Sequence, residues 1–136
     1  MSDSVFFDTN VLVYAYSNDD LVKKATALVL GAIPDRWLST QVLIEFVNVL
    51  TRKLKTGWPD AQTAVLEVTQ NHNVHQTSPD TILAATRLAQ RYGFSWFDAL
   101  IVAAALECGC ETLYSEDLNA GQLIEGRLRV VNPFQV

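Results

Sequence analysis

The chain has 136 residues, of which 49% are hydrophobic and 18% are charged. That is enough for one well-buried core and too little for two, so we expect a single domain over residues 1–136. No apolar run reaches the length needed to span a bilayer, and we expect a cytoplasmic protein that does not bind membranes. The net charge of −5 argues against a protein that holds nucleic acid by bulk electrostatic attraction. It does not exclude a nuclease, because divalent cations can neutralise an acidic site and then attract phosphate.

In chain order, short apolar runs alternate with segments of helical periodicity. The expected strands cover residues 4–7, 37–39, 72–76, 111–115 and 127–131. The expected helices cover residues 11–16, 18–32, 41–55, 78–93 and 95–106, with a further helix that begins at residue 59. This alternation predicts an α/β layer architecture with a mostly parallel central sheet, in which right-handed crossovers bring the strand ends to one edge.

Two of the predicted helices have distinctive sequences. The segment Ser78-Pro79-Asp80 is a clear helix start, and Gly93 is a typical helix end. On that helix we expect the apolar side chains to point inward (Ile82, Ala85, Leu88, Ala89 and Tyr92). The helix over 95–106 is apolar almost throughout, which predicts a central, buried position.

Four acidic residues stand where an apolar segment meets a turn or a helix: Asp8, Glu45, Asp98 and Asp117. Each has a structural alternative. Asp8 suits the N-cap of the following helix. Asp98 fits a Ser-x-x-acid capping box, and Glu45 can pair with Arg52 or face solvent. Asp117 suits a turn.

The four acids together indicate a metal site more strongly than any one of them does alone. In an open parallel sheet, ligands bind at the carboxyl ends of the strands, where these residues can converge. Carboxylates gathered there repel one another unless a cation binds them. Without a cluster of His or Cys, oxygen ligands favour Mg²⁺ or Mn²⁺ over zinc. The pattern therefore predicts a metal site suited to phosphodiester chemistry.

Four segments carry a specific family resemblance: residues 5–12, Glu45, 97–105 and 113–118. In this order they resemble the PIN domain family, and most of all its single-domain bacterial VapC-type toxins. The resemblance covers essentially the whole chain. It implies a PIN-like three-layer α/β/α sandwich and a Mg²⁺- or Mn²⁺-dependent endoribonuclease. If a metal-bound water attacks the phosphate, the RNA products carry a 5′-phosphate and a 3′-hydroxyl.

The resemblance also implies roles for particular residues. Asp8, Glu45, Asp98 and Asp117 would be the catalytic, metal-binding acids, with Thr9 or Ser115 shaping the pocket. The spacing Ser115-x-Asp117 favours Asp117 over the adjacent Glu116 as the metal ligand. In addition, Asn10 can orient a metal-bound water.

The same resemblance implies partners: a homodimer, and a small antitoxin that can place a basic side chain near the acidic pocket. Apolar residues of the early helices, including Leu21, Ala25 and Leu28, suit such a contact or the core equally. The alternative to a toxin ribonuclease is a non-catalytic PIN-like module that grips RNA or a basic peptide.

Basic and aromatic residues give weaker signals. The cluster Arg52, Lys53 and Lys55, and the pair Arg87 and Arg91, can track an RNA backbone or form solvated helix surface. The tryptophans Trp37, Trp58 and Trp96 are dispersed, so we expect burial rather than a base-stacking platform.

The remaining candidate ligands favour ordinary structural roles. His72 and His75 have no evident third ligand, so we expect surface histidines rather than a metal pair. The spacing of Cys108 and Cys110 indicates inert, partly buried thiols.

Overall fold

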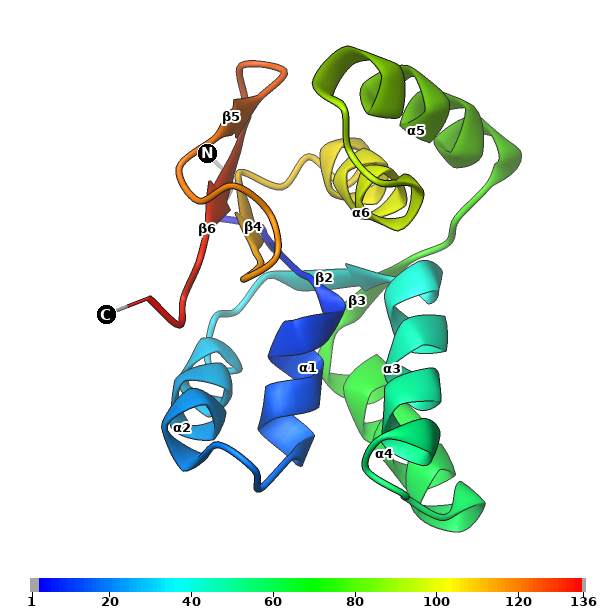
Figure 1. The fold of residues 1–136 in the computed structure, drawn as a ribbon, viewed down its shortest axis with the longest axis vertical. Coiled ribbons are helices and arrows are strands. Elements are labelled where there is room, and N and C mark those ends of the chain that lie inside the picture. The colour runs from blue at the N-terminus through cyan, green and yellow to red at the C-terminus, as the bar shows by residue number, and fades with distance from the viewer. Residues whose placement is uncertain (1–2, 136) are drawn as a thin grey trace.

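A central sheet organises the structure, a computed structural model that describes residues 3–135. Its strands are β1 (Val5–Phe7), β2 (Arg36–Ser39), β3 (Asn73–His75), β4 (Thr112–Tyr114), β5 (Leu123–Ile124) and β6 (Leu128–Val131). The strand order is β3-β2-β1-β4-β6-β5 (Figure 1). Every neighbouring pair is parallel except β5 with β6, which is antiparallel. The predicted mostly parallel sheet is therefore confirmed.

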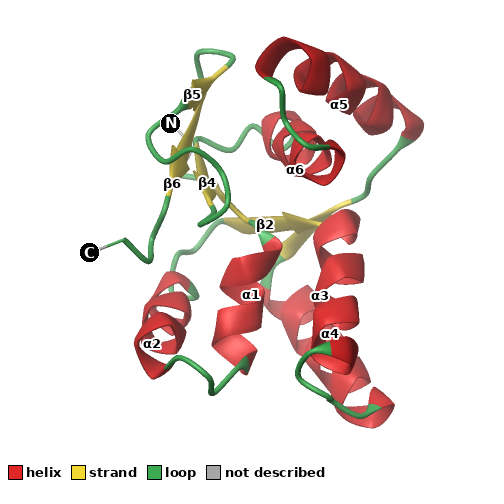
Figure 2. Ribbon diagram, viewed as in Figure 1, coloured by secondary structure: helices red, strands yellow, loops and turns green. Residues whose placement is uncertain are grey.

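Helices cover both faces of this sheet. They are α1 (Thr9–Tyr16), α2 (Leu21–Leu30), α3 (Thr40–Arg52), α4 (Trp58–Asn71), α5 (Pro79–Tyr92) and α6 (Trp96–Glu107). Figure 2 shows α5 and α6 on one side of the sheet and α1 to α4 on the other. The predicted three-layer α/β/α arrangement is confirmed. No helix within residues 3–135 is long and apolar enough to cross a membrane.

The helix ends follow the capping chemistry of the sequence. The Asp20 carboxylate accepts a hydrogen bond from the Lys23 backbone N–H and begins α2. A full capping box begins α5, because Ser78 and Thr81 each bond the other's backbone N–H through a side chain. The same helix ends at Gly93, whose φ of 76° is left-handed and suits glycine.

The side chains of β1 belong to two core clusters. Phe6 belongs to the larger cluster, which joins residues of α1, α3, α4, α5 and α6, whereas Val5 and Phe7 belong to a smaller cluster with α1 and α2. Successive side chains of a strand face opposite sides, which explains the division. Every residue of α6 from Ala99 to Leu106 is buried. The predicted central position of this helix is confirmed.

The structure departs from the sequence prediction in three places. The two-residue strand β5 was not predicted, because two residues are too few to show a period. The α3 helix ends at Arg52 rather than near Lys55, which adopts a left-handed φ of 56°. Ile82 was expected to point inward from α5 but is exposed. Its helix packs mainly through Thr81, Ala85 and Leu88.

Candidate metal centre

Asp8 is held between two strand ends. It follows β1 directly, and its backbone N–H donates to the Tyr114 carbonyl at the end of β4 at 3.0 Å. Its Oδ1 accepts from the Thr9 backbone N–H at 2.7 Å, which caps α1. Its Oδ2 accepts from the Ser115 hydroxyl at 2.7 Å. Capping leaves further lone pairs on both oxygens, so the capping role and a ligand role are compatible.

Ser115 and Asn10 connect Asp8 with Asp117. The buried Ser115 Oγ accepts from the backbone N–H groups of Asp117 at 3.1 Å and Leu118 at 3.4 Å, while donating to Asp8. The Asn10 side-chain N–H donates to Asp117 Oδ2 at 3.1 Å and, more weakly, to Asp8 Oδ2 at 3.5 Å. The turn after β4 thus carries Asp117 beside the end of β1.

Glu45 reaches the same region from α3. Its Oε2 accepts from the Thr9 hydroxyl at 2.6 Å, and its Oε1 accepts from the Gln41 side-chain amide at 3.3 Å. Neither bond involves Arg52, so the alternative of an Arg52 ion pair is wrong. Thr9 is the residue next to Asp8, and the bond therefore fixes α3 against the start of α1.

Asp98 lies in the first turn of α6 and is half-buried. Its backbone N–H donates to the Ser95 hydroxyl at 3.3 Å, which caps the helix. Its carboxylate makes no hydrogen bond or ion pair with any residue from 3 to 135, so the alternative of a reciprocal capping box is wrong. An unpaired carboxylate at a helix N-terminus is available to a ligand.

Glu116 lies beside this centre, but its carboxylate contacts other residues than Asp8 and Asn10. It accepts hydrogen bonds from the Tyr14 hydroxyl and from Lys23 Nζ, the latter at 2.9 Å. Its neighbour Asp117 instead contacts Asn10. The geometry therefore favours Asp117 as the acid that faces the centre, in line with the spacing argument.

The electrostatics of the centre are most evident at Asp8, which is 5% exposed. Burial raises the pKa of its carboxyl from 3.8 to about 6. The bonds from Ser115 and Thr9 lower this pKa, and the negative charges of Asp117 and Asp98 raise it. Asp8 therefore senses the charges of both other aspartates.

The atoms around Asp8 that can act as metal ligands suit a hard cation. They are all oxygens of carboxylates, hydroxyls and one amide, which is the chemistry that Mg²⁺ and Mn²⁺ prefer. The Asn10 side-chain oxygen is buried and has no hydrogen-bond partner in the described part of the chain. Within residues 3–135, no three acidic, His or Cys side chains stand close enough to form a ready metal cage. The residues fit a cation by their chemistry, and their role as ligands stays a prediction.

The centre opens to solvent through a cavity of about 520 Å³. Its polar lining includes Thr9, Asn10, Glu45, Glu116 and Asp117, together with Lys53, whereas Asp8 and Asp98 do not line it. A size of this order is typical of ligand sites. Lys53, a member of the basic cluster Arg52, Lys53 and Lys55, thus lies beside Glu45 and Asp117.

Two supporting contacts were missed by sequence reasoning. Gln41 is four residues before Glu45, a helical spacing that places the side chains side by side and that could have revealed the contact. The contacts of Glu116 with Tyr14 and Lys23 join segments far apart in the chain. No local pattern predicts them.

The histidines do not form a metal pair in the described structure. His72 Nδ1 contacts the Val68 carbonyl at 2.9 Å, and His75 Nε2 contacts the Glu107 carboxylate at 2.9 Å. Both rings are half-buried rather than exposed, and His72 lies edge-on against Phe7.

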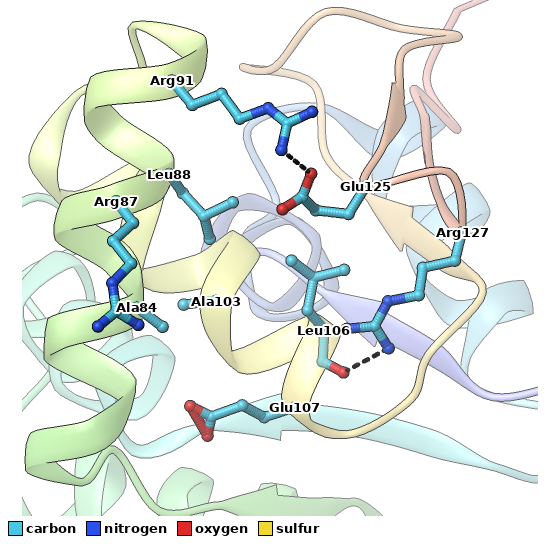
Figure 3. Close-up of a pocket in the computed structure, with 9 residues that line it drawn as sticks. All are labelled: Ala84, Arg87, Leu88, Arg91, Ala103, Leu106, Glu107, Glu125 and Arg127. Carbon is cyan, nitrogen blue, oxygen red and sulfur yellow. Dashed lines mark hydrogen bonds and ion pairs between the residues drawn. The ribbon is translucent and has the colours of Figure 1, made fainter.

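The arginine pair of α5 lines a different cavity, of about 430 Å³. Figure 3 shows Arg87, Leu88 and Arg91 along one side of the cavity, with Leu106 and Glu125 opposite them. Arg91 pairs with Glu125 at 3.0 Å. None of the four acids lines this cavity, so these arginines do not border the acidic centre.

Comparison with known proteins identifies the family. The sequence profile of the PIN domain matches residues 5–123, which is most of the chain. The chain belongs to the PIN domain family. No curated protein sequence matches this PIN domain significantly.

Solved structures share the fold of this PIN domain. The toxin VapC20 of Mycobacterium tuberculosis, which cleaves the sarcin-ricin loop, has a TM-score of 0.70 at 23% identity over 84% of this chain and 90% of its own. A toxin-antitoxin complex from Klebsiella pneumoniae has a TM-score of 0.73 at 22% identity over 98% of this chain and 100% of its own. VapBC2 from Rickettsia felis, bound to a DNA fragment from its promoter, has a TM-score of 0.66 at 16% identity over 94% of this chain and 98% of its own.

Proposed function

We propose that this PIN domain is a Mg²⁺- or Mn²⁺-dependent endoribonuclease that acts as the toxin of a toxin–antitoxin pair. The proposal is supported by the contacts of Ser115 and Asn10, which join Asp8 and Asp117 beside the end of β1. There the charges of Asp98 and Asp117 act on the buried Asp8 carboxyl. Fold likeness to VapC20, a toxin that cleaves the sarcin-ricin loop, supports the reaction type.

In this proposal the four acids share one role and two neighbouring residues support them. Asp8, Asp98, Asp117 and Glu45 would hold the cation, which supplies Lewis-acid stabilisation of the phosphate and an activated water nucleophile when bound. Ser115 fixes the orientation of the Asp8 carboxylate, and Asn10 that of Asp117. Hydrolysis would leave a 5′-phosphate and a 3′-hydroxyl.

A small antitoxin is the proposed partner. The fold neighbours include a toxin–antitoxin complex from Klebsiella pneumoniae, and VapBC2 from Rickettsia felis and FitAB, each bound to a DNA fragment. The acidic chain, with its net charge of −5, suits a partner with a basic side chain at the centre. Apolar side chains of α2, such as Leu21, Val22 and Leu28, are exposed and supply surface for the antitoxin or for a homodimer.

Cleavage of a mixed pool of structured RNAs tests the proposed reaction. The wild-type protein should cut with Mg²⁺ or Mn²⁺ and not with EDTA. Folded Asp8→Asn and Asp98→Asn variants should lose the activity. Glu116→Gln is the matched control, because the carboxylate of this acid in the same turn bonds Tyr14 and Lys23 rather than Asn10 or Asp8, and this variant should still cut.

Several outcomes of this assay would contradict the proposal. Cutting that persists in EDTA, or in both aspartate variants, would exclude the metal-dependent reaction at this centre. Products with a 2′,3′-cyclic phosphate would exclude attack by water. Binding of RNA without cutting by the wild type would favour a non-catalytic binding module.

A further inference from the structure

The cavity of about 430 Å³ lies between α5, α6 and the turn that joins β5 to β6. Its inner wall is apolar, because Leu88 of α5 and Ala103 and Leu106 of α6 line it and belong to the main core. Figure 3 shows arginine side chains on both sides of this wall. An apolar cavity of this size with a few charged groups around it is typical of a small-molecule site.

The turn between β5 and β6 is fixed against α5. Glu125 adopts a left-handed φ of 52°, and the Arg127 backbone N–H closes the turn with a hydrogen bond of 3.1 Å. The Glu125 carboxylate pairs with Arg91 at 3.0 Å and accepts from the Tyr92 hydroxyl at 2.8 Å. The Tyr92 hydroxyl also accepts from the Glu125 backbone N–H at 3.0 Å. The wall that carries Arg127 is therefore held in place before a ligand binds, which lowers the cost of binding.

The two carboxylates that line the cavity already have partners. Glu125 is bound by Arg91, and Glu107 Oε2 contacts His75 Nε2 and accepts from the Thr81 hydroxyl, both at 2.9 Å. Three arginines and two glutamates line the cavity, which leaves a surplus of one positive charge. This surplus matches a ligand that carries a single negative charge.

Arg87 and Arg127 supply the unused hydrogen-bond donors. Arg87 makes no hydrogen bond or ion pair within residues 3–135. One guanidinium nitrogen of Arg127 donates to the Leu106 carbonyl at 3.3 Å, and its other guanidinium N–H groups have no partner in that part of the chain. A guanidinium presents five N–H donors in one plane, and their geometry matches a carboxylate.

We propose that this cavity binds a small organic carboxylate with an apolar body, of the size of a medium-chain fatty acid. Arg87 and Arg127 bind the carboxylate, and the apolar body lies on the wall of Leu88, Ala103 and Leu106. A phosphate dianion fits less well, because the two glutamates of the lining repel its second charge. The site does not depend on the proposed cleavage reaction, since none of the four acids of the metal centre lines it.

Calorimetric titration of the wild-type protein with octanoate tests the inference. Octanol has the same apolar body without the charge, acetate has the charge without the body, and inorganic phosphate is the dianion. We expect octanoate to bind at least about tenfold more tightly than each of these three, because both the wall and the arginines contribute to binding. If any of the three binds as tightly as octanoate, the assignment of the ligand is wrong.

Variants of the lining test whether octanoate binds in this cavity. The double variant Arg87→Ala/Arg127→Ala removes both partners of the carboxylate and should raise the Kd at least about tenfold. Ala84→Leu fills the cavity from α5, where Ala84 is partly buried, and should also raise the Kd. Arg52→Ala is the matched control, because Arg52 is an exposed arginine that does not line the cavity. It should leave the Kd unchanged.

Each variant is first checked for an unchanged thermal unfolding curve without ligand. If the double variant does not fold, Arg87→Ala alone decides in its place, because this exposed side chain has no partner to lose. Absence of octanoate binding by the wild type, or an unchanged Kd in the folded arginine variant, would overturn the inference. An equal rise of the Kd in Arg52→Ala would do so too, because binding would then follow the overall charge rather than this cavity.

Discussion

At the residue scale, the Ser115 hydroxyl holds the acidic centre together. It donates to Asp8 and accepts from the backbone N–H groups of Asp117 and Leu118, so one buried side chain joins the ends of β1 and β4. Loss of one partner leaves buried polar groups unsatisfied, and this costs more than the bond itself contributes.

Ser115→Ala is therefore expected to lower the free energy of unfolding by about 1–3 kcal/mol. It should also reduce cleavage at temperatures where the variant remains folded, because Asp8 and Asp117 lose their common anchor. Urea unfolding and single-turnover cleavage measure the two effects. Thr86→Ala, which removes an exposed hydroxyl that bonds only its own helix, should change neither. A Ser115→Ala protein with wild-type stability and activity would contradict this role.

Asp8 gives a prediction about pH. Its pKa is raised from 3.8 to about 6 in the folded protein without metal, so the folded state binds this proton more tightly than the unfolded state does. The stabilising effect of protonation is present below pH 4 and is lost as the pH rises through 6. Ionised Asp8 therefore destabilises the folded protein above this window, by at most about 3 kcal/mol.

Asp8→Asn removes this titration. In EDTA the variant should be more stable than the wild type at pH 8, while the difference should shrink toward pH 4. Urea unfolding of both proteins at the two pH values measures it. The buried-carboxylate account would be contradicted if the free energies of unfolding of wild type and variant differed by the same amount at pH 4 and pH 8.

The candidate site was only partly predictable from residues. Asp8 and Asp98 stand beside strongly apolar segments, so local pattern was enough to select them. The spacing Ser115-x-Asp117 already favoured Asp117 over Glu116, whereas the contacts of Glu116 with Tyr14 and Lys23 needed the structure, because these partners come from distant helices. The expected burial of the tryptophans is wrong for Trp58 and Trp96, which are 64% and 41% exposed, because tryptophan is buried on average but local packing decides each case.

At the element scale, capping residues and apolar runs predicted the helices. Features that depend on contacts between elements, such as a short strand or the width of a buried helix face, were not predicted. The capping box of α5 and the apolar run of α6 are local, and both helices formed where expected. The strand β5 depends on pairing with β6 and has too few residues for a pattern. Ile82 has the correct period for burial but faces solvent, because the width of the packed face depends on its neighbours.

The cap of α5 allows stability to be separated from function. Ser78→Ala should lower the free energy of unfolding by about 1 kcal/mol, because it removes an N-cap bond and half of the capping box. Cleavage per folded molecule should not change, since Ser78 lines none of the cavities at the acidic centre. Thermal unfolding and cleavage of the same sample measure both. Loss of cleavage in fully folded Ser78→Ala protein would show that the centre extends to α5.

At the scale of the whole molecule, the topology explains why residues as far apart in the chain as Asp8 and Asp117 lie together. The central strand β1 lies between β2 and β4, and all three are parallel, so their carboxyl ends share one edge. Helices α1 and α3 begin at that edge, and the turn after β4 contributes Asp117. Sequence alternation predicted parallel strands but not this strand order, which depends on contacts between distant segments.

The central claim is that these converging carboxylates bind a divalent cation. Calorimetric titration of Mn²⁺ at pH 8, where Asp8 is ionised, tests it directly on the wild type, Asp98→Asn and Glu116→Gln. Wild type and Glu116→Gln should bind with similar affinity, and Asp98→Asn should bind at least about tenfold more weakly, because even the loss of an outer partner of a metal site has an effect of that order. Equal affinity in all three proteins, or no binding by the wild type, would contradict the account.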